Sequence, residues 1–381
     1  MPRPIKVCID PAAMAHNLER VLEILRQSAA NRADIPKVWA VIKANAYGHG
    51  IEVAVKAFAK ADGLAMLDVD EAVRCRLAGW TKPILLLEGF FDGEDLQACR
   101  QWDLWPVVHA QGQIDMLNKA DLQAFGVGGL RVFLKLDTGM HRLGFVPAAY
   151  RQAYEQLLAL KAQGKLADVA HMTHFACADE PDGIDSPLLV FEDTVHGLAG
   201  PKCVANSASV LRHTRKILKL HESSTQGSWV RPGVCLYGIS PMADMTAAEL
   251  GLKPSMSLQS QVISVKTVPS GVGVGYSYRY RTSSDTRLAV VACGYADGYP
   301  RHAPNGTPVV VRGKRASLVG RVSMDMLAID VTHIGDVQVG DPVVLWGKAG
   351  LSAEEIANAS GTIAYTLMTG VTTRVRRCIS E

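Results

Sequence analysis

The stretch that decides the fold is Val38-Trp-Ala-Val-Ile-Lys-Ala-Asn-Ala-Tyr-Gly-His-Gly50. It begins as an apolar, β-branched run, which predicts a buried strand, and the run stops at a single lysine, Lys43. The small residues and glycines that follow predict a turn into a new helix. An ammonium group is costly to remove from water. Lys43 is therefore either a lysine that reaches water from a strand end, or one kept reactive for a Schiff base with a carbonyl cofactor.

Short apolar runs alternate with segments of helical spacing from residue 37 to about residue 235. The predicted strands are Val38–Ile42, Gly63–Leu67, Ile84–Leu87, Trp105–Val108, Val132–Leu136, Val169–Thr173, Cys203–Ala205 and Trp229–Val230. This alternation predicts a parallel sheet, and eight strands over about two hundred residues match a TIM-like (β/α)8 barrel. An open doubly wound sheet is the alternative, although the first strand lacks the glycine-rich phosphate turn that such a fold normally carries. A further helix is predicted before the barrel, from about Pro11 to Ser28.

The pattern changes after about Gly251, where strand-like runs follow one another without helices between them. These runs are Ser257–Val265, Leu288–Ala292, Pro308–Val311, Ala316–Val319, Leu327–Val331 and Pro342–Trp346. Turn pairs such as Asn305-Gly306 separate them, which predicts a mainly antiparallel β domain. One late helix is predicted to begin at Ser352, with Glu355 completing a capping box. We therefore expect a barrel domain over residues 1–250 and a β domain over residues 251–381.

The composition of the 381 residues, 48% hydrophobic and 20% charged, is typical of a globular enzyme with a large core. A net charge of +3 is too small to indicate a nucleic-acid partner. No apolar run is long enough for a membrane span, and the N-terminus lacks the apolar core of a signal peptide. The eight cysteines are scattered without a Cys-x-x-Cys pair, which predicts reduced thiols in a cytoplasmic protein. No metal site is predicted, because His171 and His174 would point to opposite faces of a strand.

Polar residues follow five of the predicted strands, at the end where barrel enzymes bind their substrates. They are Lys43, Arg142, His174, the pair Asn206-Ser207, and Arg231. Each has an ordinary interpretation alone, as a cap neighbour, a core histidine or a turn former, but their joint placement at one mouth indicates a site. The loops after strands seven and eight often bind phosphate in this fold. Here Asn206-Ser207 and Gly233-Val234 offer a hydroxyl and backbone N–H groups, so we expect pyridoxal phosphate (PLP) as cofactor.

The segment Ala40–Gly50 resembles the PLP attachment motif of bacterial alanine racemases. The resemblance extends over nearly the whole chain and includes Lys135–Gly144, Thr173–Ala176, Ala205–Ser207, Arg231–Gly233, Gly294-Tyr-Ala-Asp-Gly298, Gly320-Arg-Val-Ser-Met-Asp325 and Arg374-Val-Arg-Arg377. It implies an alanine racemase that supplies D-alanine for peptidoglycan. It also implies a homodimer whose active sites combine both chains.

By this resemblance, Lys43 carries the cofactor and is one of two catalytic bases. The other base is a tyrosine of the β domain, matched here by Tyr276 from the partner chain. Ser277 stands where the family usually has glycine, which makes Tyr278 a rival. Spacing favours Tyr276, because it lies nineteen residues before Tyr295, as the family pattern expects.

The resemblance also implies binding roles. Arg231 would face the pyridine nitrogen and His174 would bond to that arginine. The phosphate would be held by Tyr47, Ser207, Gly233, Val234 and Tyr365. Arg142 would reach the cofactor's phenolic oxygen and the substrate carboxylate, which the backbone N–H of Met324 also contacts. The entrance would be lined by Asp179, Tyr295, Arg301 and Arg321.

Two-base racemisation needs one group on each face of the α-carbon. Free lysine and tyrosine titrate at roughly 10.4 and 10, so the pKa of each must be lowered, as nearby cations such as Arg142 and Arg231 would do. Arg231 keeps its proton. The pyridine nitrogen should therefore stay unprotonated, which favours quick reprotonation of the carbanion over transamination.

Lys135 lies seven residues before Arg142, in a strand that could point it inward, where two cations would repel. The resemblance implies that Lys135 is carbamylated, which turns it into an anion that steadies the arginine. An ordinary lysine paired with a carboxylate is the alternative.

Three other functions are alternatives to this one. A PLP-dependent decarboxylase would place an acid against the pyridine nitrogen and a cysteine in the second-chain site, which Arg231 and Met324-Asp325 oppose. A single-domain PLP-binding protein without turnover would lack the β domain. An amino-acid racemase of broader range stays open, because pocket width depends on packing, although the bulky entrance tyrosines favour alanine.

Overall fold

The computed structural model describes residues 3–120, 129–222 and 227–380. Within these residues eight parallel strands close into a barrel, and the last strand pairs back with the first. The barrel strands are β2 (Lys37–Val41), β3 (Gly63–Met66), β4 (Ile84–Leu86), β5 (Leu104–Val108), β6 (Leu130–Lys135), β7 (Leu166–Met172), β8 (Lys202–Ala205) and β9 (Ser228–Val230). Every predicted barrel strand is confirmed, and closure of the sheet excludes the doubly wound alternative.

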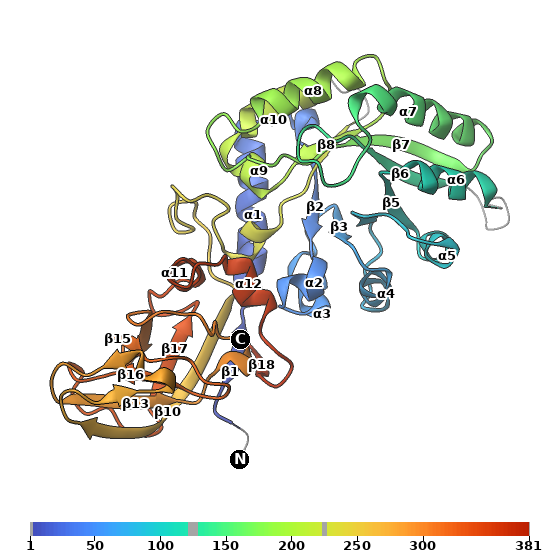
Figure 1. Cartoon of the computed structure of the whole chain (residues 1–381). Coiled ribbons are helices and arrows are strands. Elements are labelled where there is room, and N and C mark those ends of the chain that lie inside the picture. Colours follow the sequence, from blue (N-terminus) through green and yellow to red (C-terminus); the bar gives the residue numbers. More distant parts are fainter. Residues whose placement is uncertain (1–2, 121–128, 223–226, 381) are drawn as a thin grey trace.

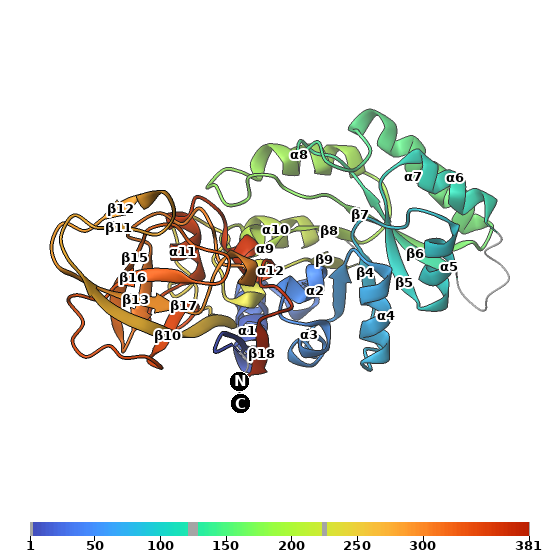
Figure 2. The same cartoon turned by 60° about the horizontal axis from the view of Figure 1, so that its bottom comes forward.

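Helices cover the outside of the barrel between successive strands (Figure 1, Figure 2). They are α3 (Ile51–Ala57), α4 (Val69–Leu77), α5 (Gly93–Gln101), α6 (Gln111–Lys119), α7 (Pro147–Ala162), α8 (Asp185–Val195), α9 (Ser207–Arg212) and α10 (Thr214–Glu222). The predicted leading helix is α1 (Pro11–Ser28). Asp10 caps its start, because the Asp10 side chain accepts a hydrogen bond from the Ala13 N–H. Among the described helices, none has both the length and the apolar character that a membrane span requires.

Aromatic side chains fill part of the barrel interior. Trp39 of β2 stacks on Trp229 of β9 with ring centroids 4.0 Å apart. Its ring also meets Trp105 of β5 edge-on at 5.5 Å. Because β2 and β5 are not neighbours in the sheet, this contact crosses the interior. Side chains therefore fill the barrel interior around these aromatic residues. A binding site in such a barrel forms at the carboxyl ends of the strands rather than inside it.

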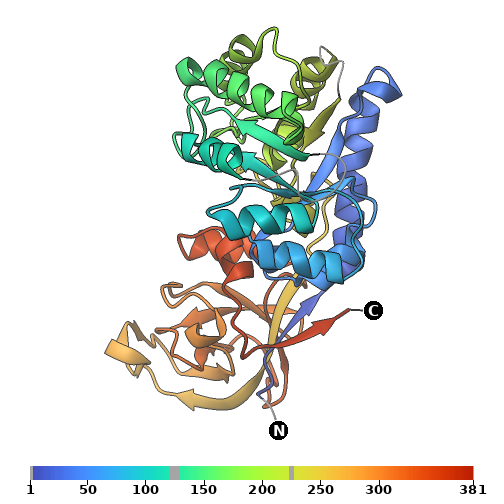
Figure 3. The same cartoon turned by 90° about the vertical axis from the view of Figure 1, so that its right-hand side faces the viewer.

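The second sheet is the predicted β domain, and it lies beside the barrel in all three views (Figure 3). Its strands, in spatial order, are β13 (Thr286–Val291), β16 (Leu327–Asp330), β15 (Lys314–Val319), β14 (Pro308–Val311), β17 (Pro342–Trp346), β10 (Met256–Val268), β1 (Lys6–Ile9) and β18 (Arg376–Ile379). All pairings are antiparallel except β1 with β18. The remaining elements are the hairpin of β11 (Gly273–Val274) and β12 (Tyr280–Arg281), the left-handed segment labelled α2 (Lys43–Tyr47), α11 (Ala353–Ala359) and α12 (Ala364–Thr369). The Ser352 cap of α11 is confirmed, since its hydroxyl accepts a hydrogen bond from the Glu355 N–H.

The start of the chain belongs to the second sheet rather than to the barrel. Strand β1 pairs antiparallel with β10 and parallel with β18, so the β domain includes residues from both ends of the chain. Cys8 and Cys378 lie in register on β1 and β18, with Cα atoms 4.7 Å apart, and form a disulfide. The prediction of reduced thiols is therefore wrong for this pair, because a strand pairing across 370 residues cannot be recognised from cysteine spacing. The division near residue 250 stays a prediction.

Candidate active site

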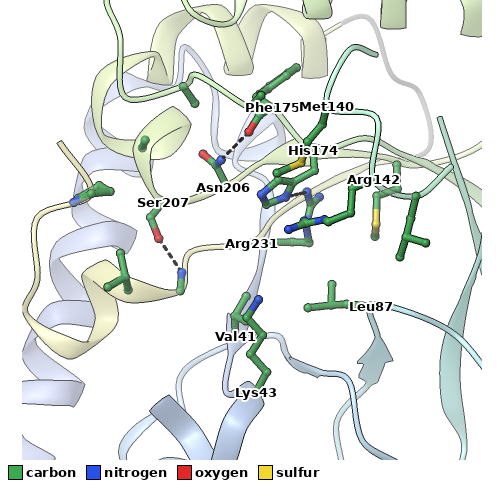
Figure 4. A pocket seen from close by; sticks show the side chains of 18 of the residues that line it. Val41, Lys43, Leu87, Met140, Arg142, His174, Phe175, Asn206, Ser207 and Arg231 are labelled. Carbon is green, nitrogen blue, oxygen red and sulfur yellow. Dashed lines mark hydrogen bonds between the residues drawn. The ribbon is translucent and has the colours of Figure 1, made fainter. Parts of the chain in front are cut away.

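The carboxyl ends of the barrel strands surround a cavity of about 400 Å³. The predicted site residues that line it are Lys43, Tyr47, Lys135, Arg142, His174, Asp179, Asn206, Ser207, Arg231, Gly233, Val234 and Tyr365. Figure 4 shows the Lys43 side chain extending into this cavity, toward the strand ends that carry Arg231 and His174. The predicted cluster at one barrel mouth therefore exists in the fold. Glu88 also lines the cavity and was not predicted, although it directly follows the predicted strand Ile84–Leu87, the same position that marked the other polar residues.

Lys43 is presented by an unusual turn. Four consecutive non-glycine residues after it, Ala44 to Tyr47, have φ angles between 50° and 55°. Each left-handed residue costs roughly 1–2 kcal/mol, so the surrounding structure must hold this turn in place. The Ala46 N–H donates to the Ile42 carbonyl at 2.8 Å. Gly48, with φ of 80°, ends the turn where a Cβ would lie 2.3 Å from the Met368 carbonyl oxygen, so only glycine fits there.

Cations dominate the cavity. Burial, and then the charge of Arg142, lower the pKa of Lys43. Burial, followed by the charges of Arg231 and Arg142, lowers the pKa of Lys135 to about 8. Lys135 is only 7% exposed, yet among the described residues no carboxylate forms an ion pair with either lysine or with Arg142. A cavity with this excess of positive charge suits an anionic occupant.

Arg231 is fixed by carbonyl groups of the barrel and is only 4% exposed. Its guanidinium donates to the carbonyls of Cys203 and Thr173, each at 2.6 Å. It also donates to Nδ1 of His174 at 3.3 Å, as predicted. Burial and then the charge of Arg231 hold the pKa of His174 well below its usual range, so the ring is neutral and can accept this bond. Arg231 is thus a rigid cation at the base of the cavity.

Hydroxyl and backbone groups gather on another wall of the cavity. The Ser207 hydroxyl accepts a hydrogen bond of 2.8 Å from the Gly233 N–H. A Cβ at Gly233 would lie 2.6 Å from the Tyr47 hydroxyl, so this position requires glycine. The rings of Tyr47 and Tyr365 are 5.9 Å apart, and burial raises the pKa of both phenols, which keeps them neutral donors. Asn206 caps α9 through a 3.0 Å bond from the Ser209 N–H, and its predicted role in cofactor binding stays a prediction.

Apart from Tyr365, the predicted residues of the β domain do not line this cavity. Tyr276 and Met324 are 68% and 52% exposed. The segments that carry them are linked within the β domain: Arg321, three residues before Met324, donates to the hydroxyl of Ser277 at 3.4 Å, and the Ala296 N–H donates to the Met324 carbonyl at 3.0 Å. The structure therefore brings these residues together on an exposed surface, apart from Lys43 of the same chain.

The alignment of the chain with family models covers both domains. Residues 9–241 match the model of the alanine racemase N-terminal domain, and residues 255–379 match that of the C-terminal domain. The chain belongs to the alanine racemase family. It is 52% identical to an alanine racemase from Bordetella petrii and 48% identical to one from Bordetella avium, each over 98% of both chains. The crystal structure of the biosynthetic alanine racemase from Pseudomonas aeruginosa superposes with a TM-score of 0.89 at 41% identity, with each chain fully covered.

Alanine racemases use PLP, and the cavity of this family member fits that cofactor. Lys43 offers an amine for a carbonyl group, while Arg231 can face a ring nitrogen. The hydroxyls of Tyr47 and Ser207 and the backbone of Gly233 can hold a phosphate. One continuous cavity is lined both by Lys43 and Arg231 and by the groups that can hold a phosphate, so a flat ring with a phosphate arm could contact both.

Proposed function

We propose that this chain interconverts L-alanine and D-alanine with PLP, and that Lys43 and Tyr276 are the two bases. The observation that carries the proposal is the position of Lys43, which reaches a cationic cavity next to a hydroxyl and backbone cradle. The relatives named alanine racemase support alanine over a broader range of amino acids. The supply of D-alanine for peptidoglycan and a cytoplasmic location stay predictions, and the Cys8–Cys378 disulfide removes the cysteines as an argument for that location.

Proton transfer in this mechanism depends on the surroundings of Lys43. Burial and Arg142 favour its neutral amine, which is the form that can take a proton from the α-carbon. Bound PLP supplies an electron sink for the charge that this leaves. Arg231 would donate a hydrogen bond to the ring nitrogen and keep its own proton, which would limit that sink and favour return of a proton over transamination.

The second base must come from another chain, because Tyr276 is exposed and does not line the cavity of its own chain. We propose a homodimer in which the exposed face of one β domain closes the barrel mouth of the other chain. Large side chains on this face include Tyr276, Tyr278, Tyr295, Met324 and Met326. Apolar and aromatic groups at such exposure are typical of a surface that a partner covers.

Arg142 and the Met324 N–H would hold the substrate carboxylate. We propose that Lys135 is carbamylated and thereby pairs with Arg142, because its amine is buried, its pKa is lowered, and no described carboxylate forms an ion pair with it. The entrance would be formed by Asp179, which lines the cavity, and by residues of the partner's β domain. In that domain the guanidinium of Arg301 lies 5.8 Å from the centroid of the Tyr295 ring.

Incubation with L-alanine in heavy water, followed by chiral analysis, tests the reaction directly. We expect D-alanine with deuterium at the α-carbon, and none with Lys43→Ala. The visible absorbance of bound cofactor should also disappear in that variant. Unlabelled D-alanine, or an intact absorbance band in Lys43→Ala, would contradict the mechanism. A parallel panel of other amino acids defines the substrate range.

A further inference from the structure

Three motifs of the sequence meet at a buried carboxylate that has no place in the mechanism above. Asp297 belongs to Gly294-Tyr-Ala-Asp-Gly298, and its side chain is fully buried. Asp325 ends the motif that contains Met324, and Arg374 begins the C-terminal motif. A buried carboxylate is costly unless it is paired and fully hydrogen-bonded, so its partners explain why it is there.

Asp297 is fully paired. Arg3 donates to both of its carboxylate oxygens, at 2.7 and 3.1 Å, and Nε of Arg374 lies 3.0 Å from Oδ1. The backbone N–H of Gly294 donates to Oδ2 at 2.9 Å. This hydrogen bond closes the short turn that carries Tyr295. Two arginines from opposite ends of the chain thus converge on one carboxylate.

The same two arginines reach the segment that carries Met324. Arg3 donates to the backbone carbonyl of Asp325 at 2.6 Å. Arg374 donates to the Asp325 carboxylate at 2.6 Å. Each arginine therefore bridges the buried Asp297 and the residue that directly follows Met324. The bonds are charge-assisted, which makes them stronger than neutral ones.

Backbone contacts join the two segments directly. The Tyr295 N–H donates to the Ser323 carbonyl at 3.0 Å, and the Ala296 N–H donates to the Met324 carbonyl at 3.0 Å. A Cβ on Gly294 would lie 2.3 Å from that Met324 carbonyl oxygen, so the approach requires glycine. The turn that carries Tyr295 and the segment that carries Met324 are therefore joined into one unit. Asp297 and its two arginines stabilise this unit.

We propose that Asp297, with Arg3 and Arg374, is a positioning group that sets the location of the Met324 N–H and of Tyr295 in the active site of the other chain. The inference rests on the proposed function, in which these residues serve the partner's substrate carboxylate and entrance. Asp297 itself touches neither substrate nor cofactor. Its effect on the reaction passes through the backbone of the two segments, where a displacement of about 1 Å is enough to weaken a reacting geometry.

The test uses Arg374→Gln, Arg3→Gln and Asp297→Asn in the dimeric holoenzyme, with Arg374→Lys as the conservative variant. Two readouts are the KM and kcat for both alanine enantiomers and the inhibition constant of propionate, which has alanine's carboxylate and methyl group but no amine. We expect KM and the propionate constant to rise about tenfold, the factor that a loss of 1.4 kcal/mol produces. The kcat and the cofactor absorbance should change less, and Arg374→Lys should recover part of the affinity.

Arg315→Gln is the matched control, because Arg315 also pairs with a carboxylate in the β domain, that of Glu355, but contacts neither segment. It should lower the melting temperature without raising KM. If Arg374→Gln and Arg3→Gln lower only the melting temperature, as this control does, the positioning role is wrong and the cluster is merely structural. Both variants keep one arginine on Asp297, so the test survives if Asp297→Asn does not fold.

Arg142→Lys separates this inference from the proposed function. Arg142 lines the barrel cavity, and its loss should weaken propionate binding whatever Asp297 does. Weaker binding in Arg142→Lys together with unchanged binding in the Arg3 and Arg374 variants would overturn the positioning role alone. Unchanged binding in Arg142→Lys would overturn the proposed carboxylate site, and the positioning role with it.

Discussion

The carboxylate of Glu71 accepts a hydrogen bond of 2.5 Å from the backbone N–H of Asn45, in the left-handed turn that follows Lys43. Glu71 comes from α4, outside the turn, whereas the other bonds of the turn are local, such as that from the Gly50 N–H to the Asn45 carbonyl. Burial raises the pKa of Glu71. A partly buried carboxylate is thus placed where it can hold the strained backbone that presents Lys43.

Replacement of Glu71 by alanine should loosen this turn. We expect Glu71→Ala to destabilise the fold by about 1–3 kcal/mol, the cost of leaving a buried N–H without a partner. Cofactor affinity and kcat should fall as well, because Lys43 loses its fixed position. Glu71→Gln keeps an oxygen acceptor and should lose less stability, less cofactor affinity and less kcat than Glu71→Ala. The measurements are urea unfolding and titration of the apoenzyme with PLP.

Glu52→Gln is a suitable control for Glu71, since Glu52 is an exposed carboxylate on neighbouring α3 that pairs with Arg74. Exposed ion pairs are worth about 0–1 kcal/mol, so this change should be small. Equal losses in Glu71→Ala, Glu71→Gln and Glu52→Gln would mean that charge near α4 matters rather than the bond to Asn45.

The barrel could be predicted from sequence because its strands are continuous apolar runs that alternate with helical patterns, and the structure reproduces their ends within three residues. Strands β1 and β18 could not be predicted. Lys6–Ile9 is only four residues long, and its partner Arg376–Ile379 begins with two exposed arginines. Their pairing joins segments some 370 residues apart, which no local pattern records.

The residues of the candidate site also divide into those that the sequence predicts and those that it does not. Lys43, His174 and Arg231 could be predicted because each is a polar residue within two residues of the end of an apolar strand, and Arg142 because it lies in the loop that follows one. Glu71 and Asp297 could not, because their partners are distant in the sequence: the backbone N–H of Asn45 for Glu71, and Arg3 and Arg374 for Asp297. Side-chain type alone does not distinguish such a carboxylate from one on a solvated helix face.

The buried pair of His171 and Tyr150 predicts loss of stability in mild acid. His171 is fully buried, the Tyr150 hydroxyl lies 2.9 Å from its Nδ1, and burial lowers its pKa from 6.5 to about 4. Between these pH values the unfolded chain binds a proton that the folded chain does not, so stability falls as the pH falls. We expect this group to contribute a loss of up to about 3 kcal/mol from pH 7 to pH 4.

Urea unfolding of the wild type and of His171→Gln across this range checks the contribution. The variant should be less stable at pH 7 but should lose less stability on acidification, because glutamine does not titrate. His213→Gln offers a comparison, since that histidine is also buried and its pKa is also lowered. Parallel pH curves for the wild type and His171→Gln would mean that His171 binds its proton equally in the folded and the unfolded chain, which would contradict this prediction.

Carbamylation of Lys135 predicts a covalent label from bicarbonate. A pKa of about 8 leaves a useful share of neutral amine near pH 7.5, and only that form reacts with carbon dioxide. In ¹³C-bicarbonate the protein should show one carbamate carbon signal by NMR. Lys135→Arg should lack that signal and should lose about tenfold or more in kcat/KM, because Arg142 no longer has an anionic partner.

Lys161→Arg provides the background for this label, because Lys161 is an exposed lysine that pairs with Asp168 on the outer surface. Its signal should match that of the wild type. A wild-type protein that is fully active in bicarbonate-free buffer and shows no carbamate carbon would leave Lys135 an ordinary amine.

The proposed homodimer, in which each active site combines two chains, predicts that two inactive variants restore activity when mixed. Lys43→Ala destroys the barrel half of a site and Tyr276→Phe destroys the β-domain half. A hybrid dimer keeps one site in which both groups are intact, so random exchange of subunits should recover about a quarter of the wild-type sites. Racemase activity is measured before and after the subunits exchange in mild denaturant. If both bases came from one chain, mixing would recover nothing, and the double variant mixed with Lys43→Ala gives that baseline.

Tyr278→Phe is the matched control for the tyrosine. It is 63% exposed and two residues away, and on its own it should retain most of the activity. Loss in Tyr278→Phe, together with activity in Tyr276→Phe, would move the second base to Tyr278.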